Sequence, residues 1–332
     1  MEASITSRGA ILLGKYTACD AFDERRPLRV VTHAHHDHIL GLHQSLKKCE
    51  AVIMTPATRD LINVVSKKLP SGDKIKALDY GQKFEYGDER LTLHYADHIL
   101  GSAQVLVEDE DGSRFLYTSD FRFERTPVIE ADILVIEATY GSPWRTRPFK
   151  DNVRDALVSL IKRFLRQGPV YIFGYHGKIQ EAMQILHDAG VQVPFIVPEK
   201  VFQVSRICER YGMRLGNYLL STGEDACSIV ERGEPYVAFY HMSSRRYVGR
   251  DMFRIYLSGW EFNSACRKIS EKEFVIALSD HSDFNGLLKY VEKSKPKLVI
   301  TDNYRVGGAE VLAEYIRKKL GIPARPLPSK WV

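Results

Sequence analysis

Three histidines and an aspartate that could bind a metal ion lie within six residues of one another, at His33, His35, Asp37 and His38. The apolar run directly before them predicts a strand, and side chains alternate along an extended chain. We therefore expect His33 and His35 to point the same way and to grip one ion. We expect Asp37 and His38 to begin an amphipathic helix and to approach, from another side, a position next to that ion. Three imidazoles and a carboxylate are typical ligands of zinc or a similar ion. We therefore favour a metal site over the alternative interpretation of this segment, which is a solvated histidine-rich turn.

One such cluster supplies too few ligands for two metal ions, so further ligands are expected at other strand ends. His98, Asp120 and His281 each follow a predicted strand. Taken singly, each of them could be a helix cap or a surface residue. Because all three lie just past strand ends, we expect their side chains to meet at one edge of the sheets. A carboxylate there, such as that of Asp120, can bind two ions.

The elements that must position these residues change character along the chain. The first part is β-rich, with predicted strands at 10–13, 28–32, 51–55, 91–94, 104–108, 115–118 and 133–136. From about residue 151, helices alternate with strands, which is the rhythm of a parallel α/β unit. Helices are predicted at 151–166, 178–189, 201–211, 285–293 and 309–320, and strands at 170–173, 195–197, 274–278 and 297–300.

The bulk composition is that of a globular protein, with 44% hydrophobic and 27% charged residues. No apolar run is long enough to span a bilayer, and the N-terminus lacks a secretory signal. The five cysteines are odd in number and scattered, so we expect no disulfide framework, no thiolate metal site and a cytoplasmic location. A net charge of +5 permits a polyanionic partner without requiring one.

The segment His33-Ala34-His35-His36-Asp37-His38 is similar to the H-x-H-x-D-H signature of the metallo-β-lactamase superfamily. More narrowly, the chain resembles the β-CASP nucleases of that superfamily. Three segments carry the narrower resemblance: His98–Ala103 is similar to H-I-L-G-S-A, Glu137–Gly141 to E-x-T-Y-G, and Ser279–Asp283 to S-x-H-x-D.

This resemblance implies an α/β fold, a metallo-β-lactamase αββα sandwich with an inserted α/β β-CASP cap domain. The hydrolase domain would comprise residues 1–145 plus 274–332, and the cap residues 146–273. Two divalent metal ions are implied, most simply Zn, with Mn as the other candidate. One ion would be held by His33, His35, His98 and Asp120, and the second by Asp37, His38, His281 and the shared Asp120.

The resemblance also implies roles around the metal ions. Asp37 would orient or deprotonate the attacking water, and His281 would bind metal or protonate the departing oxygen; these two roles of His281 compete. Asp20 and Glu137 would support the ligands from behind, although a plain turn aspartate remains an equal reading for Asp20.

The predicted partner is nucleic acid, with DNA preferred over RNA and no membrane contact. Lys178, Arg245 and Arg246 of the cap are candidate phosphate contacts. RNA-processing members of the family carry a histidine after the next strand, whereas residues 299–304 here contain none, so a DNA exonuclease in repair or end processing is expected. The alternatives are an RNA-processing ribonuclease, a thioesterase- or lactonase-type hydrolase, and a metal-free binding scaffold.

Overall fold

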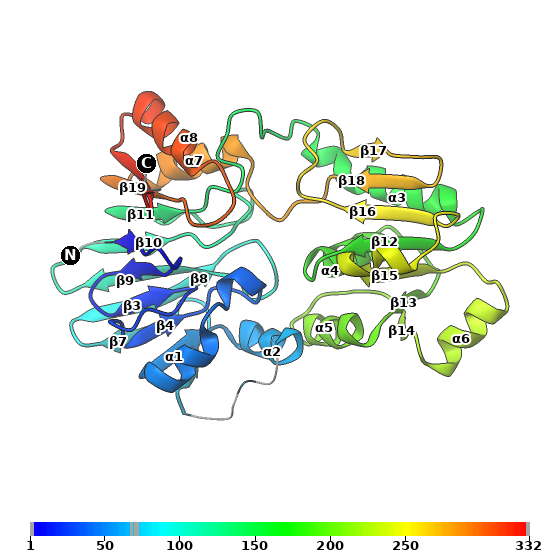
Figure 1. The fold of residues 1–332 in the computed structure, drawn as a ribbon, viewed down its shortest axis with the longest axis horizontal. Coiled ribbons are helices and arrows are strands. Elements are labelled where there is room, and N and C mark those ends of the chain that lie inside the picture. The colour runs from blue at the N-terminus through cyan, green and yellow to red at the C-terminus, as the bar shows by residue number, and fades with distance from the viewer. Residues whose placement is uncertain (1–2, 67–68, 70–72, 330–332) are drawn as a thin grey trace. The chain divides into compact units, whose positions relative to one another are not determined.

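The chain forms two compact units in the computed structural model, which describes residues 3–66, 69 and 73–329 (Figure 1). The first unit comprises residues 1–146 and 280–332, and the second comprises residues 147–279. The second unit is therefore an insertion into the first. Within the described residues, no helix is both long and apolar enough to cross a membrane.

The first unit contains two mixed sheets. One runs in the order β1-β2-β3-β4-β5-β6, with β3 to β6 parallel. Its strands are β1 (Ser4–Ile5), β2 (Ile11–Leu13), β3 (Thr17–Cys19), β4 (Leu28–Val30), β5 (Ala51–Met54) and β6 (Ile75–Ala77). The other runs in the order β20-β19-β11-β10-β9-β8-β7. Its strands are β7 (Lys83–Tyr86), β8 (Glu89–Tyr95), β9 (Ala103–Asp109), β10 (Arg114–Tyr117), β11 (Ile133–Ile136), β19 (Leu298–Asp302) and β20 (Ala324–Leu327).

Two apolar cores hold the layers of the first unit together. Fully buried side chains such as Leu13, Val30, Leu93 and Val105 pack between the two sheets. The outer face of the second sheet packs against α7 (Phe284–Ser294) and α8 (Ala309–Tyr315), which a π-helical turn, Ile316–Leu320, continues. The first sheet carries α1 (Leu42–Lys48), which contacts β5, and α2 (Pro56–Val65) follows that strand. This arrangement is the predicted αββα sandwich (Figure 1).

The second unit is a seven-stranded sheet in the order β14-β13-β15-β12-β16-β18-β17, parallel except for β17. Its strands are β12 (Val170–Gly174), β13 (Phe195–Val197), β14 (Tyr218–Leu220), β15 (Val237–His241), β16 (Phe253–Leu257), β17 (Cys266–Lys268) and β18 (Glu273–Ile276). Its helices are α3 (Val153–Phe164), α4 (Lys178–Asp188), α5 (Glu199–Arg210) and α6 (Glu224–Glu231). This is the inserted α/β cap.

The junction of the two units differs from the sequence prediction. The predicted strand at 274–278 was assigned to the hydrolase domain, whereas β18 pairs with β16 in the cap sheet. The chain returns to the first unit at Asp280, six residues later than predicted. An apolar run before a recognisable motif does not reveal which sheet it joins, because that choice depends on partners far away in the sequence.

Candidate metal centre

The candidate ligands follow strands that end at one edge of each sheet. In the first sheet β3 and β4 are parallel, so Asp20 and the segment 33–38 emerge at the same edge. In the second sheet β10 and β11 are parallel, and Asp120 and Glu137 follow their carboxyl ends. β8 has the direction of β10, because each is antiparallel to β9, and His98 follows it. The topology therefore gathers residues that lie far apart in the sequence.

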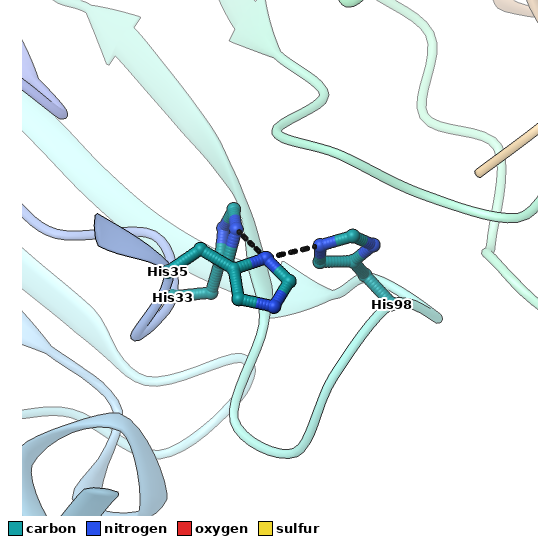
Figure 2. Close-up of side chains that lie close together, drawn as sticks. All are labelled: His33, His35 and His98. Carbon is teal, nitrogen blue, oxygen red and sulfur yellow. Dashed lines mark hydrogen bonds between the residues drawn. The ribbon is translucent and has the colours of Figure 1, made fainter. Parts of the chain in front are cut away.

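Three histidine rings form the first ligand group (Figure 2). Nδ1 of His35 lies 3.1 Å from Nε2 of His33 and 3.0 Å from Nε2 of His98. Oδ2 of Asp120 lies 3.8 Å from Nε2 of both His33 and His98. The geometry brings together the four residues predicted for one ion.

The segment that carries His33 and His35 reaches this geometry differently from the prediction. β4 ends at Val30, and residues 33–35 form a bend rather than a continued strand. Asp37 and His38 lie in a 3-10 turn, His36–His38, and the α-helix begins only at Leu42. Gly41 separates the turn from the helix with a φ of 68°, a left-handed conformation that favours glycine. The predicted helix start at Asp37 was wrong.

His38 and Asp37 form a second group of donors beside the first. Nε2 of His38 lies 3.3 Å from Oδ2 of Asp120 and 3.3 Å from Oδ2 of Asp37. This nitrogen is buried and makes no hydrogen bond. A buried nitrogen facing two carboxylates is a costly arrangement without a cation or proton to join them. The donor set therefore fits a metal ion, with Asp120 shared between two positions.

Asp20 fixes the orientation of His38 from behind. Its side chain is fully buried, and its Oδ2 lies 2.7 Å from Nδ1 of His38. It also accepts hydrogen bonds from the backbone N–H and the hydroxyl of Thr32, both at 2.9 Å. A ring that donates from Nδ1 presents the lone pair of Nε2 to the centre. These contacts support the ligand-orienting reading of Asp20 over the plain turn aspartate.

His281 reaches the centre from the segment that returns from the cap. Its Nδ1 lies 3.1 and 3.2 Å from the two carboxylate oxygens of Glu137. Its ring centroid lies 4.8 Å from that of His98, and it belongs to a donor group with His98 and Asp120. Glu137 also accepts from the backbone N–H of Phe121 at 3.1 Å. Glu137 therefore contacts both the His281 ring and the segment that carries Asp120.

Sequence reasoning missed two groups that touch the centre. Ser119, at a φ of 56°, donates to the Thr32 hydroxyl at 2.8 Å, and its Oγ lies 3.3 Å from Nδ1 of His33. Arg305, in the loop after β19, lies 3.6 Å from Oδ2 of Asp37. Ser119 could have been found from the sequence, because it directly precedes the candidate ligand Asp120. Nothing in the sequence connects Arg305 with Asp37, which lies 268 positions away.

The protonation preferences of the histidines fall into two classes. Burial lowers the pKa of His98 to about 3 and, with His38 and His98 nearby, holds that of His33 well below its usual value. Burial also lowers the pKa of His38, but the Asp120, Asp20 and Asp37 carboxylates outweigh it and raise the pKa well above normal. His33 and His98 are therefore neutral at pH 7, which is the form that binds metal. The carboxylates around His38 instead favour a positive charge, from a proton or a metal ion, on its ring.

His281 and Asp120 complete this pattern of charge. Burial lowers the pKa of His281, but Glu137 and Asp120 raise it to about 9. Burial raises the pKa of Asp120, but His38 and His281 lower it to well below its usual range. The carboxylates of the centre thus stabilise positive charge at His38 and His281.

The predicted phosphate contacts of the cap differ in exposure. Arg245 and Arg246 are exposed in the 3-10 segment Met242–Tyr247, beside Tyr247, which is 74% exposed. Lys178 opens α4 but is buried, with 9% of its surface exposed. Of the three candidates, the two arginines have the exposure that a phosphate contact needs.

Comparison with known proteins agrees with this geometry. Residues 30–176 match the family model of the metallo-beta-lactamase superfamily. An "Uncharacterized protein in lig 3'region" of Acidianus ambivalens is 40% identical over 138 residues, which are 41% of this chain and 99% of that protein. A crystal structure of a protein of unknown function from Enterococcus faecalis V583 has the same fold, with a TM-score of 0.63 at 13% identity over 91% of this chain and 79% of that one.

Two longer relatives have names that state a function. A "Probable DNA ligase" of Opitutus terrae is 27% identical over 87% of this chain, which spans 28% of the ligase. The "Transcription termination factor FttA" of Methanothermobacter thermautotrophicus is 31% identical over 54% of this chain, which spans 34% of that factor.

The fold, the metal-ligating motif and these similarities define a metallo-β-lactamase-type hydrolase with an inserted cap. The chain belongs, through residues 30–176, to the metallo-β-lactamase superfamily, and its inserted second unit agrees with the resemblance to the β-CASP members of that superfamily.

Proposed function

We propose that this protein is a metal-dependent nuclease that hydrolyses phosphodiester bonds of nucleic acid, preferentially DNA, and trims DNA ends as an exonuclease. The observation that carries the proposal is the convergence of His33, His35 and His98 with Asp120 beside the second pair, Asp37 and His38. Such a donor set holds two divalent ions, most simply Zn or Mn, and a pair of ions accounts for the buried, unbonded Nε2 of His38.

Bound ions of this kind lower the pKa of a water molecule and polarise a phosphoryl oxygen. The chain's own residues would complete the reaction. Asp37, whose side chain is 57% exposed, is placed to orient the water and accept its proton. His281, whose Nδ1 lies 3.1 Å from Glu137 and whose Nε2 lies 3.7 Å from Oδ1 of Asp280, would protonate the departing oxygen from Nε2. The exposure of Asp37 supports a role in contact with solvent and substrate.

Exposed aromatic and cationic side chains of the cap support a nucleic-acid substrate. Tyr175 follows β12 and is 52% exposed, and its ring lies 5.1 Å from that of His241 at the end of β15. Tyr247 follows in the same segment, with the Arg246 guanidinium 4.8 Å from its ring. Because β12 and β15 are parallel, these residues share the carboxyl edge of the cap sheet. Bases stack on such rings, and the arginines offset phosphate charge.

The preference for DNA rests on two further observations. A relative named as a DNA ligase contains a segment similar to 87% of this chain, and nucleolytic trimming produces the ends that ligation joins. The strand β19 ends at Asp302 and is followed by Asn303 and Tyr304, without the histidine expected of RNA-processing members. The FttA relative supports the second candidate, an RNA-processing ribonuclease. The five cysteines are free, in keeping with the proposed cytoplasmic location.

The test compares matched oligonucleotides in Zn or Mn. Linear single- and double-stranded DNA, closed circular DNA and RNA of the same sequence are incubated with the purified protein. We expect linear DNA to be degraded, circular DNA to survive, and RNA to be cleaved at least tenfold more slowly. Faster cleavage of RNA would select the ribonuclease, and activity on a thioester alone would select the small-molecule hydrolase.

A further inference from the structure

Arg305 projects from the loop between β19 and α8 toward the Asp37 side of the metal centre. Its Nη1 donates to Oδ2 of Asp302 at 2.6 Å, which fixes the guanidinium at the end of β19. Its Nε lies 3.6 Å from Oδ2 of Asp37, and Nη2 donates to the Asp37 carbonyl oxygen at 3.4 Å. The side chain is 11% exposed, and its Nε is buried without a hydrogen bond.

The loop holds Arg305 in this position rather than letting it swing into solvent. The N–H of Gly308 donates to the carbonyl oxygen of Ala138 at 2.8 Å, which ties the loop to the segment after β11. A side chain at Gly9 would collide with the ring of Tyr304, so the loop also packs closely against the β1–β2 turn. Asp302 accepts from the N–H of Tyr304 at 2.9 Å. A guanidinium held this firmly acts as a fixed positive charge.

The two candidate ion positions of the centre differ in the ligands that converge on them. The first has three imidazoles, His33, His35 and His98, converging with Asp120 nearby. The second has His38 and Asp120, with His281 in a donor group that shares Asp120, but the structure places Asp37 in none of the three convergent donor groups found among the described residues. The Asp37 carboxylate is instead within ion-pair distance of Arg305.

We propose that Arg305 makes the two metal positions unequal: it competes for Asp37, so that the second ion binds much more weakly than the first. This inference rests on the metal centre of the proposed function. A second divalent ion must share the Asp37 carboxylate with a guanidinium that never loses its proton, and it meets that positive charge in a partly desolvated recess. When the second position is vacant, Arg305 supplies positive charge on that side of the centre.

The test measures metal binding without reference to cleavage. The full chain is stripped with chelator and titrated with Zn²⁺ by calorimetry, and with Mn²⁺ by electron paramagnetic resonance, in which paired Mn²⁺ ions give a coupled spectrum. For the wild type we expect one tight equivalent and a second at least tenfold weaker, so that one equivalent of Mn²⁺ gives an uncoupled spectrum. Two equally tight equivalents would overturn the proposal.

Variants separate charge from structure. Arg305→Met, which removes the charge at similar side-chain length, should tighten the second equivalent at least tenfold. Arg305→Lys should keep the wild-type inequality. Arg254→Met is the matched control, because Arg254 is a buried arginine paired with Glu273 at 2.9 Å in the cap; it should leave both affinities unchanged. An unchanged or weakened second equivalent in Arg305→Met would contradict the proposal.

Failure of this inference is distinguishable from failure of the proposed function. A wild-type protein that binds two ions equally and still degrades DNA refutes the role of Arg305 alone. A protein with unequal metal affinities that cleaves no nucleic acid refutes the nuclease and leaves the role of Arg305 intact. If Arg305→Met does not fold, the wild-type titration still decides the inequality.

Discussion

The buried carboxylate of Asp20 lies 2.7 Å from Nδ1 of His38, so the ring presents Nε2 to Asp37 and Asp120. Removing the negative charge at Asp20 should loosen this orientation. We expect Asp20→Asn to lower metal affinity about 10–100-fold, the usual effect of losing a partner behind a ligand. Asp23→Asn, which alters a surface pair with Arg25, is the control and should leave affinity unchanged. Equal affinities for all three proteins by competition titration would contradict this account of Asp20.

His281 is predicted to act on the leaving oxygen. We expect His281→Gln to slow DNA cleavage about 10²–10⁴-fold, the range typical of losing a general acid. A p-nitrophenyl ester of thymidine phosphate needs no protonation of its leaving group, so its hydrolysis should fall far less. Rates on both substrates are measured alongside metal content. Equal losses on both, together with loss of bound metal, would instead make His281 chiefly a ligand.

Gly101 closes the turn that follows His98. Its φ is +83°, and a Cβ there would lie 2.6 Å from the backbone nitrogen of Thr58. Gly112 has a similar φ of +85° but faces open space. Both alanine variants should lose about 1 kcal/mol from the left-handed backbone, and Gly101→Ala a further ~1–3 kcal/mol from overpacking. Denaturant unfolding measures the free energy of unfolding of both variants. Equal losses would show that the turn adjusts to the added Cβ and would contradict the overpacking expected at Gly101.

The cap edge is predicted to bind single-stranded DNA by stacking. In an Asp120→Asn background that blocks cleavage, we expect Tyr247→Ala to weaken binding by about 1–3 kcal/mol, the usual value of one stacked base. Arg246→Ala should reduce the slope of affinity against salt, because one phosphate contact is lost. Tyr211→Ala, at a 40% exposed tyrosine after α5, is the control. Binding is measured by fluorescence anisotropy. The same affinity for Tyr247→Ala and Tyr211→Ala would contradict a stacking role for Tyr247.

The residues that converge in the candidate metal centre could be predicted from the sequence because their signal is local. His33, His35, Asp37 and His38 lie within one short segment, and strand ends deliver the others. The helix after them starts at Leu42 rather than Asp37, because Gly41 in a left-handed conformation first turns the chain. Local periodicity did not show that turn.

The remaining differences come from long-range pairing. The run at 274–278 was assigned to the wrong unit because its partner, β16, is chosen by tertiary packing. Strands β15 and β16 were not predicted, although both lie inside the cap sheet. Arg305 was missed for the same reason, since its contact with Asp37 joins the two ends of the first unit.

The most direct test of the central claim is metal-dependent cleavage of end-labelled linear DNA. The wild type is stripped with chelator and then resupplied with Zn or Mn, beside Asp120→Asn, which changes the carboxylate shared by both ligand groups. We predict no cleavage by the stripped protein, recovery on addition of metal, and a rate at least about 10³-fold lower in the variant. Cleavage that survives chelation, or an Asp120→Asn protein as active as the wild type, would contradict a metal centre at this site.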